Sequence, residues 1–443
     1  MTGRHGYALL TAIVALIVVI SAALYAGVSY GTGRRAAAPA DSRGPVHHAA
    51  PASSGTWVAT WAASPAAAEP GTETTGMAGR SVRNVVHTSV AGTSARITLS
   101  NLYGRSPLSV THATIALAAG GTTAAAAPHT MRRLTFAGAP SVVVPSGGQV
   151  MSDAVSLAVP RGADVLVTTY SPTPSGPVTY HPYARQISYV AQGDLAENVT
   201  GTPYTEQTSV WRYLSAVDVL SDAADGAVVV LGDSLTDGVT STLGADRRWT
   251  DVLSTRLWTA VEKGRDVPNY SVVNEGISGN QVLTGGLGRP ADNPSGLSRF
   301  ERDVLERTGV KVVVIDLGIN DILRNPQLAD PEQITGGLRT LVEQAHARGL
   351  KVVGATLMPF EGRRGYTPAK EEIRQRVNAE IRSGRVFDAV VDFDKALRDP
   401  YNPRRLRGEY DSGDHLHPSD RGYREMADVF EPSLLKGAAR ARL

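Results

Sequence analysis

The sequence predicts two folded regions of different class, an all-β region over residues 56–222 and an α/β region over residues 227–443. Residues 56–222 contain short runs that alternate apolar and polar side chains, separated by turn-forming residues, with no long helical period. This pattern predicts an antiparallel β-sandwich or jelly roll. After residue 227, continuous apolar runs alternate with helical patterns. Such alternation predicts a parallel sheet that helices cover on both faces.

The N-terminal residues precede both regions and differ from them in composition. Tyr7–Tyr30 contains no charged residue and is rich in Ala, Val, Ile and Leu, and a helix of this length can cross the hydrocarbon core of a membrane. No clear small-x-small cleavage site occurs before Gly31. We therefore interpret residues 1–35 as an uncleaved signal-anchor in preference to a cleaved signal peptide. Residues 36–55 are rich in Ala, Pro and Ser, which predicts a flexible linker. The expected location is extracytoplasmic, with the protein either anchored to the membrane through this segment or secreted.

The composition excludes several classes of function. The formal net charge is +2, with 44 basic and 42 acidic residues, which gives no indication of a nucleic-acid partner. The chain has no cysteine, so disulfides, Fe–S clusters, thiolate zinc sites and a cysteine nucleophile are excluded. The composition does not indicate an oligomeric state.

The strands expected in the all-β region are short. Val86–Val90 and Arg96–Ser100 alternate apolar and polar residues, as half-buried strands do. Val142–Val144 precedes a Pro-Ser-Gly-Gly turn, and Asp164–Tyr170 is a further strand.

The α/β region is read as five strands separated by helices. The strands are expected at Val228–Leu231, Ser271–Val273, Val312–Leu317, Val352–Ala355 and Val390–Phe393. The helices are expected at about Trp249–Lys263, Leu297–Arg307, Gln333–Arg348, Ala369–Ile381 and Arg421–Leu435. Ligands of such sheets bind outside the carboxyl ends of the strands. Ser234 follows the first strand, residues 274–279 follow the second, and Asn320 follows the third.

Ser234 is a candidate nucleophile. It lies in Gly232-Asp233-Ser234-Leu235 at the end of the first apolar strand, where the chain turns into a helix. A serine hydroxyl becomes an effective nucleophile when a base takes its proton. Helix capping fits the same residues, because Ser or Asp after a strand satisfies free backbone amides. Both interpretations stay open for this motif alone.

His417 is a candidate general base, in the loop sequence Asp414-His415-Leu416-His417-Pro418. Asp414 lies three residues earlier and can hold one ring nitrogen, which leaves the other for Ser234. The alternative is a surface loop with a turn-forming aspartate and a solvated histidine. His415 points away from His417 in an extended segment, so we expect it at the surface or behind the site.

Acyl transfer also requires hydrogen-bond donors where negative charge develops on oxygen. Three candidates follow adjacent strands: the Ser234 amide, the Gly279 amide and the Asn320 side chain. Gly279 also suits a turn with positive φ, and Asn320-Asp321 also suits an Asx turn. These alternatives do not explain why polar groups of complementary roles lie at one end of the sheet.

Four sequence blocks resemble those of the SGNH hydrolases, also called GDSL-type lipases and esterases. The blocks occur in the order of that family and are Gly232-Asp233-Ser234-Leu235, Asn274-x-Gly276-x-x-Gly279, Gly318-x-Asn320-Asp321 and Asp414-x-x-His417-Pro418. The resemblance covers residues 227–443 and implies a three-layer, flavodoxin-like α/β/α fold.

The same resemblance implies the roles of the site residues. Ser234 is implied as the nucleophile, His417 as the base, Asp414 as its orienting partner, and Gly279 with Asn320 as oxyanion-hole donors. Spacing from Asn274 favours Gly279 over Gly276 as the glycine donor. Residues 57–222 resemble the β-domain that precedes such a module in some actinobacterial members. The resemblance implies an ester substrate, small or polysaccharide, and no cofactor.

Three other functions stay open. A metal site would use carboxylates and imidazoles of Asp233, Asp237, Asp321, Asp414, His415 and His417, although their spacing matches no metal motif. A surface carbohydrate-binding protein would rely on the β-region, with the hydrolase module inactive. An acyltransferase would use the same triad with a sugar or alcohol in place of water.

Two loops are expected to border the site at the strand ends, Asn280–Pro294 and Phe360–Pro368. The second carries Arg363, Arg364 and Tyr366, and both loops are interpreted as lids or a polar rim, or as solvated connectors. Aromatic residues make up only 6% of the chain, and no long apolar lid is visible. We therefore expect short acyl esters, including O-acetyl sugars, in preference to long-chain triglycerides.

Overall fold

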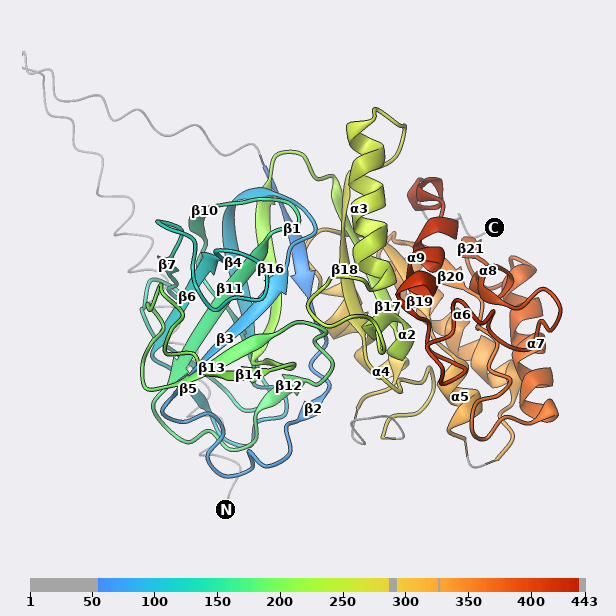
Figure 1. Cartoon of the computed structure of the whole chain (residues 1–443), viewed down its shortest axis with the longest axis horizontal. Coiled ribbons are helices and arrows are strands. Elements are labelled where there is room, and N and C mark those ends of the chain that lie inside the picture. Colours follow the sequence, from blue (N-terminus) through green and yellow to red (C-terminus); the bar gives the residue numbers. More distant parts are fainter. Residues whose placement is uncertain (1–54, 287–292, 326, 438–443) are drawn as a thin grey trace, which may run out of the picture. The chain divides into compact units, whose positions relative to one another are not determined.

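A computed structural model describes residues 55–286, 293–325 and 327–437 of the chain (Figure 1). Ser54–Leu443 form one compact unit. The predicted signal-anchor over residues 1–35 lies outside the described residues, as does the predicted linker except for Gly55. Within the described ranges, no helix is both long and apolar enough to span a membrane.

Two antiparallel sheets form the β-region. The first has the order β1-β16-β4-β10, with β9 also paired to β4: β1 (Thr56–Ala62), β16 (Leu214–Ser221), β4 (Gly92–Ser100), β10 (Val155–Val159) and β9 (Gln149–Met151). The second has the order β14-β13-β3-β11-β6-β7: β14 (Glu206–Thr208), β13 (Ser188–Gln192), β3 (Arg80–His87), β11 (Asp164–Ser171), β6 (His112–Leu117) and β7 (Arg132–Arg133). Two small sheets complete the region: β15 (Trp211–Arg212), β12 (Thr179–His181) and β2 (Ala67–Ala68), and the pair β5 (Leu108–Val110) and β8 (Val142–Val144).

The two large sheets share one hydrophobic core. Ile97 and Val217 of the first sheet lie in the same buried cluster as Val82 and Val167 of the second. Each of these side chains is almost fully removed from water, which is the main stabilising contribution to such a core. The predicted all-β sandwich is therefore confirmed.

Strand β3 differs from its prediction in two ways. The predicted strand Val86–Val90 ends at His87, after which the amide of Thr88 donates to the carbonyl of Ala163. The prediction that it is half-buried is wrong, because both faces of β3 are covered. Val86 faces the sandwich core, and Val85 packs in a second cluster with loop residues on the outer side of the sheet.

The α/β region is built on a five-stranded parallel sheet with the order β18-β17-β19-β20-β21. In chain order the strands are β17 (Gly226–Gly232), β18 (Tyr270–Gly276), β19 (Val310–Asp316), β20 (Lys351–Ala355) and β21 (Ala389–Val391). This is the 2-1-3-4-5 order of flavodoxin-like sheets. From β17 the chain first adds β18 on one side and then crosses to β19 on the other side. Sheets of this kind bind ligands in the crevice outside the carboxyl ends of the strands at this point.

Helices cover both faces of this sheet (Figure 1). The longer ones are α3 (Trp249–Glu262), α6 (Pro331–Ala347), α7 (Pro368–Arg382) and α9 (Asp420–Val429). The shorter ones are α2 (Ser234–Asp237), α4 (Gly296–Phe300), η1 (Glu301–Leu305), α5 (Ile319–Leu323), α8 (Phe393–Leu397) and η2 (Pro432–Leu435). Alternate residues of β17 point to opposite faces: Val229 packs with Leu338 of α6, and Val230 packs with Leu253 of α3. These are the three layers that were predicted.

The β-region packs directly against the α/β region. Ala59 and Ala62 of β1 and Ala216 of β16 belong to the core cluster that also contains Val229 of β17. The amide of Ala59 donates to the carbonyl of Thr308 at 3.0 Å. Figure 1 shows β1 beside β18. The alanines keep this contact close, because a larger side chain at a buried position requires space that a packed core does not have.

Candidate active site

Ser234 is the first residue of α2, directly after β17. Asp233 caps this helix, and its Oδ1 accepts from the Leu235 amide at 3.0 Å. Asp233, and not Ser234, therefore caps the helix. The Ser234 hydroxyl forms its hydrogen bond with another residue. Gly276 allows α2 to lie close to β18, because a Cβ at that position would stand 2.3 Å from the amide nitrogen of Asp237.

His417 lies beside Ser234 although the two residues are far apart in the sequence. Its Nε2 is 2.8 Å from the Ser234 Oγ. Its Nδ1 is 2.6 Å from Asp414 Oδ2. Buried Leu416 anchors this loop in the core that lies under α6 and α7. Ser234, His417 and Asp414 therefore form one hydrogen-bonded chain, which is the geometry of a Ser-His-Asp triad.

The Asp414 carboxylate is held in its ionised form. Burial alone would raise its pKa, but hydrogen bonds from the His417 ring and from the amides of His417 and Leu416 outweigh burial and lower the pKa. A carboxylate that stays ionised fixes the adjacent imidazole in the tautomer with hydrogen on Nδ1. That tautomer leaves the Nε2 lone pair for the Ser234 hydroxyl.

The candidate oxyanion donors line one cavity together with Ser234 and His417. Gly279 has φ +80° and Asn320 lies at the start of α5, and both contribute to the wall of this cavity. The Asn320 side chain donates to Asp233 Oδ2 at 3.0 Å and accepts from Arg324 Nε at 3.1 Å. One hydrogen of the Asn320 amide group remains for a ligand, because an NH₂ group has two.

Asp233 is a buried carboxyl group with a raised pKa. Burial is the largest cause, and the charge of nearby Asp316 adds to it. Hydrogen bonds from the Leu235 amide and the Asn320 side chain act in the opposite direction. Asp233 thus connects the turn that carries Ser234 with the side chain of Asn320.

The cavity has a volume of about 390 Å³, within the usual range for small-molecule sites. Its apolar walls come from Val239, Leu323 and Leu416. The expected rim loop 360–368 contributes Arg363 and Arg364, whereas Tyr366 packs against Phe360 with ring centroids 5.4 Å apart. Tyr183 reaches the cavity from the β-region. Of the second expected rim loop, residues 287–292 lie outside the described residues.

His415 lies apart from the triad, as expected. Its Nδ1 is 2.7 Å from Asp411 Oδ2, and its side chain is 49% exposed. Its φ of +64° places it in the left-handed region. The ring therefore turns outward because of a tight turn, and not because of an extended strand.

The sequence did not single out His181, which lies on β12 of the β-region. His181 Nε2 is 2.9 Å from Asp237 Oδ1, and Asp237 lies on the same short helix as Ser234. The other carboxylate oxygen, Asp237 Oδ2, accepts from the amide and hydroxyl of Ser278, the neighbour of Gly279. A buried side chain of the β-region is thus connected to both the helix that carries Ser234 and the loop that carries Gly279.

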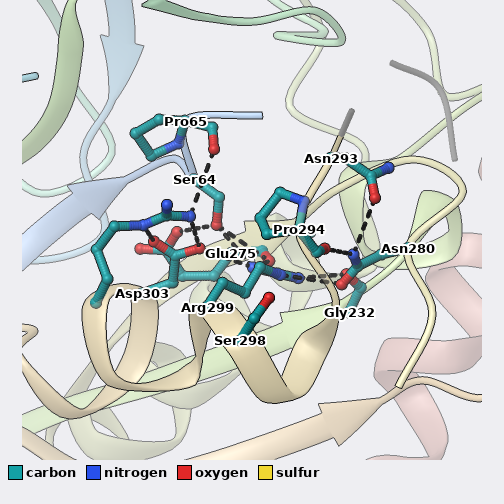
Figure 2. Close-up of polar contacts among 12 residues, drawn as sticks. Ser64, Pro65, Gly232, Glu275, Asn280, Asn293, Pro294, Ser298, Arg299 and Asp303 are labelled. Atoms are coloured by element: carbon teal, nitrogen blue, oxygen red, sulfur yellow. Dashed lines mark hydrogen bonds and ion pairs between the residues drawn. The ribbon is translucent and has the colours of Figure 1, made fainter. Parts of the chain in front are cut away.

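A second connection runs through Arg299 of α4, which is fully buried (Figure 2). Its guanidinium donates to the Gly232 carbonyl at 2.9 Å and to Asn280 Oδ1 at 2.9 Å. It also donates to Ser64 Oγ of the β-region at 2.8 Å and pairs with Asp303 at 3.1 Å. The guanidinium therefore ties the turn before Ser234, the loop after Gly279 and the β-region together.

Glu275 lies beside this arginine and is also fully buried (Figure 2). Burial is the largest influence and raises the pKa of Glu275 to about 6, although Arg307 opposes it. The Ser64 hydroxyl donates to Glu275 Oε2 at 2.6 Å. No local pattern indicates these contacts, because Ser64 is more than two hundred positions from both partners.

The part of the chain that carries this arrangement matches a known protein family. Residues 230–425 match the model of the GDSL-like lipase/acylhydrolase family. They form a GDSL-like lipase/acylhydrolase domain. All five candidate site residues lie within the matched range of this domain. Members of the family hydrolyse esters, and the chain is therefore an ester-hydrolysing enzyme.

Solved structures also resemble about half of this chain. A lipolytic protein of the G-D-S-L family from Desulfitobacterium hafniense is 22% identical, with a TM-score of 0.35, over 47% of this chain and 99% of that one. An acetyl xylan esterase from Geobacillus stearothermophilus is 22% identical, with a TM-score of 0.36, over 50% of this chain and 99% of that one. A search of curated proteins found no match. The assignment rests on the family match.

The six residues of the metal hypothesis do not converge in the GDSL-like domain. Asp321, for example, accepts from the amides of Val282 and Leu283 and so holds the loop after Gly279. Among the described residues, one group has three potential ligand atoms within 4.8 Å of one another, and none of the six belongs to it: it consists of His87, Asp164 and Asp246. Its geometry is that of an ion pair, since His87 Nδ1 is 2.9 Å from Asp164 and 3.3 Å from Asp246.

Proposed function

We propose that this protein is a serine carboxylic-ester hydrolase, with Ser234 as nucleophile, His417 as general base and Asp414 as its orienting partner. Gly279 and Asn320 supply oxyanion-hole donors, together with the Ser234 amide. The observation that carries the proposal is the continuous hydrogen-bonded chain from Ser234 Oγ through both nitrogens of His417 to Asp414, at 2.8 and 2.6 Å.

The proposed reaction has two halves. Ser234 Oγ attacks the ester carbonyl carbon while His417 Nε2 takes the hydroxyl proton, and the oxyanion donors stabilise the tetrahedral intermediate. The C–O bond to the alcohol then breaks, and His417 returns the proton to the departing alkoxide. In the second half, water attacks the acyl-enzyme by the same steps, which releases the carboxylic acid and restores Ser234.

We propose short acyl esters, including O-acetyl sugars, as the substrate class. The cavity of about 390 Å³ with arginines at its rim supports this choice, because a long acyl chain needs an extended apolar wall. We also propose an extracytoplasmic location, with the segment Tyr7–Tyr30 in the membrane as an anchor or removed as a signal. The composition of that segment supports this proposal.

Replacement of the nucleophile tests the proposed reaction. Ser234→Ala should lower kcat on p-nitrophenyl acetate by about 10³- to 10⁶-fold with the fold retained. Ser383→Ala is the matched control, because Ser383 is an exposed residue that ends α7, and its hydroxyl bonds to the backbone of Glu380 and Arg385. A Ser234→Ala protein that keeps a tenth of the wild-type rate would rule out Ser234 as nucleophile.

A further inference from the structure

Three arginines from two separate loops line the same cavity as Ser234. Arg324 follows α5, and Arg363 and Arg364 lie between β20 and α7. Within the part of the chain that the structure describes, no aspartate or glutamate lines this cavity. The positive charge at the mouth is therefore a property of this site and not of the chain, whose formal net charge is only +2.

The three guanidinium groups differ in their protein contacts. Arg324 donates to the Asn320 side chain at 3.1 Å, and Arg363 pairs with Asp414 at 3.1 Å. Both therefore stand directly beside candidate catalytic groups. Arg364 is exposed at the rim. Asp414 offsets the charge of Arg363, and the described residues that line the cavity add no carboxylate of their own, so positive charge dominates its lining.

Such a rim has a specific chemical preference. A guanidinium is always charged and presents a planar set of donors that matches the oxygens of carboxylate or phosphate. Positive charge in a cleft also raises the local concentration of anions. A neutral ester leaves these donors to water and gains nothing from them.

From this geometry we propose that the site selects esters whose acyl or alcohol part carries an anionic group, a carboxylate or a phosphate, which the Arg324, Arg363 and Arg364 rim binds. This inference rests on the proposed ester hydrolysis and narrows its substrate class. The ester carbonyl lies at Ser234, and the anionic group lies toward the arginine loops. Arg364 acts in binding and not in the chemical step.

Two matched pairs of esters test the proposal. One pair carries the charge on the alcohol side, 4-acetoxyphenylacetate against 4-acetoxyphenylacetamide. The other carries it on the acyl side, p-nitrophenyl adipate monoester against the corresponding adipamate. In at least one pair the wild-type kcat/KM should favour the anionic ester by about 10-fold or more, chiefly through KM, as expected for a charged hydrogen bond. The preference should shrink as salt is added.

Charge reversal at the rim provides the second arm. Arg364→Glu should lower the anionic-to-neutral ratio of kcat/KM by at least about 10-fold, and Arg364→Ala by less. Use of the ratio removes any general effect on catalysis. Arg348→Glu is the matched control, because Arg348 is an exposed arginine. It ends α6, close to the amino ends of the strands and away from the cavity. This variant makes the same change in net charge and should leave the ratio unchanged.

The outcomes separate this inference from the proposed function. Ser234-dependent hydrolysis of all four esters with no anionic preference in either pair would overturn the inference and leave the esterase intact. An equal loss of preference in Arg348→Glu would also overturn it, because the effect would then come from net charge. If no ester is hydrolysed in a Ser234-dependent manner, the proposed function itself fails.

Discussion

Two histidine–aspartate pairs meet the Ser234 helix, one at its first residue and one at its last, and they differ in what faces the second ring nitrogen. In the last loop, His417 Nδ1 faces Asp414 and its Nε2 faces the Ser234 hydroxyl. In the β-region, His181 Nε2 faces Asp237 and its Nδ1 faces the Ser64 carbonyl at 2.9 Å. The first pair has a hydroxyl as its outer partner, and the second has a carbonyl.

The difference determines what each imidazole can do. A hydroxyl can donate, so the ring of His417 can be neutral and accept a proton. A carbonyl and a carboxylate only accept, so both nitrogens of His181 must carry hydrogen, and the ring is an imidazolium. Burial would lower the pKa of His181, but the Asp237 carboxylate and the Ser64 carbonyl outweigh it and raise the pKa. The same pair of residue types is thus placed to act as a base in one region and forms a fixed ion pair in the other.

The largest difference should appear when the base is removed. His417→Ala should lower kcat by about 10³- to 10⁶-fold, because no other group then takes the proton of Ser234. His415→Ala is the control two positions away, and it should keep near wild-type kcat because its ring pairs with Asp411 at the surface. A pronounced loss in His415→Ala with activity retained in His417→Ala would show that the base has been assigned to the wrong ring.

The orienting carboxylate should matter almost as much. Asp414→Asn should lower kcat by about 10⁴-fold, because an amide NH₂ facing Nδ1 favours the tautomer that has no lone pair on Nε2. Asp411→Asn makes the same chemical change beside His415, and its kcat should stay close to that of the wild type. If the two variants lose activity equally, the effect arises from the loop and not from the tautomer of His417.

Removal of the proposed oxyanion donor Asn320 should have a smaller effect, and the effect should be on kcat. Asn320→Ala should lower kcat by about 10²- to 10³-fold with little change in KM, because this bond strengthens in the transition state. Asn269→Ala removes an asparagine that precedes β18, at the opposite end of the sheet, and serves as the control. An effect of Asn320→Ala confined to KM would make this residue a substrate-binding group instead.

The ion pair at the β-region should have the smallest effect on kcat and a clear effect on stability. His181→Gln leaves the buried Asp237 carboxylate without its cation, which should reduce the free energy of unfolding by about 3–5 kcal/mol. Because Asp237 also holds Ser278, the same variant should displace Ser278 and its neighbour Gly279. This displacement should lower kcat by about 10- to 10²-fold. His346→Gln breaks a similar pair, with Asp388 at 2.9 Å, and should reduce stability without lowering kcat.

The pH dependence of this stability contribution has a defined sign. The folded-state pKa of His181 lies above its ordinary value of 6.5. The contribution is therefore complete below about pH 6.5 and is lost as pH rises through the raised folded-state pKa. Urea unfolding between pH 6 and 9 should show the wild type and His181→Gln converging toward high pH. A difference that is constant or grows with pH would mean that His181 is neutral in the folded protein.

The α/β region followed from its sequence almost strand by strand. Its strands are buried on both faces, so their apolar runs are continuous, and glycines and caps mark the helix ends. Ser234, Gly279 and Asn320 were placed together because the carboxyl ends of parallel strands meet at one edge of the sheet. For β3 the alternating pattern was misleading, because a second cluster of loop residues covers the face that was expected to be exposed.

The buried contacts that connect the site to the β-region could not be predicted from the sequence. Ser64, His181 and Arg299 show no spacing that relates them to Ser234, because they meet only when the β-sheets pack on the α/β region. Arg299 looked like an ordinary residue of a predicted helix, and the structure buries it completely. A local pattern contains no information about which distant acceptor a guanidinium will find.

Covalent labelling tests the central claim, a Ser234 nucleophile activated by His417, most directly. A fluorophosphonate should inactivate the wild type with one group bound per chain, and peptide mass analysis should locate that group on Ser234. His417→Ala should be labelled far more slowly, whereas His181→Gln should be labelled to the same final extent. Complete inactivation with the group on another residue, or labelling of Ser234 at an unchanged rate in His417→Ala, would contradict the account.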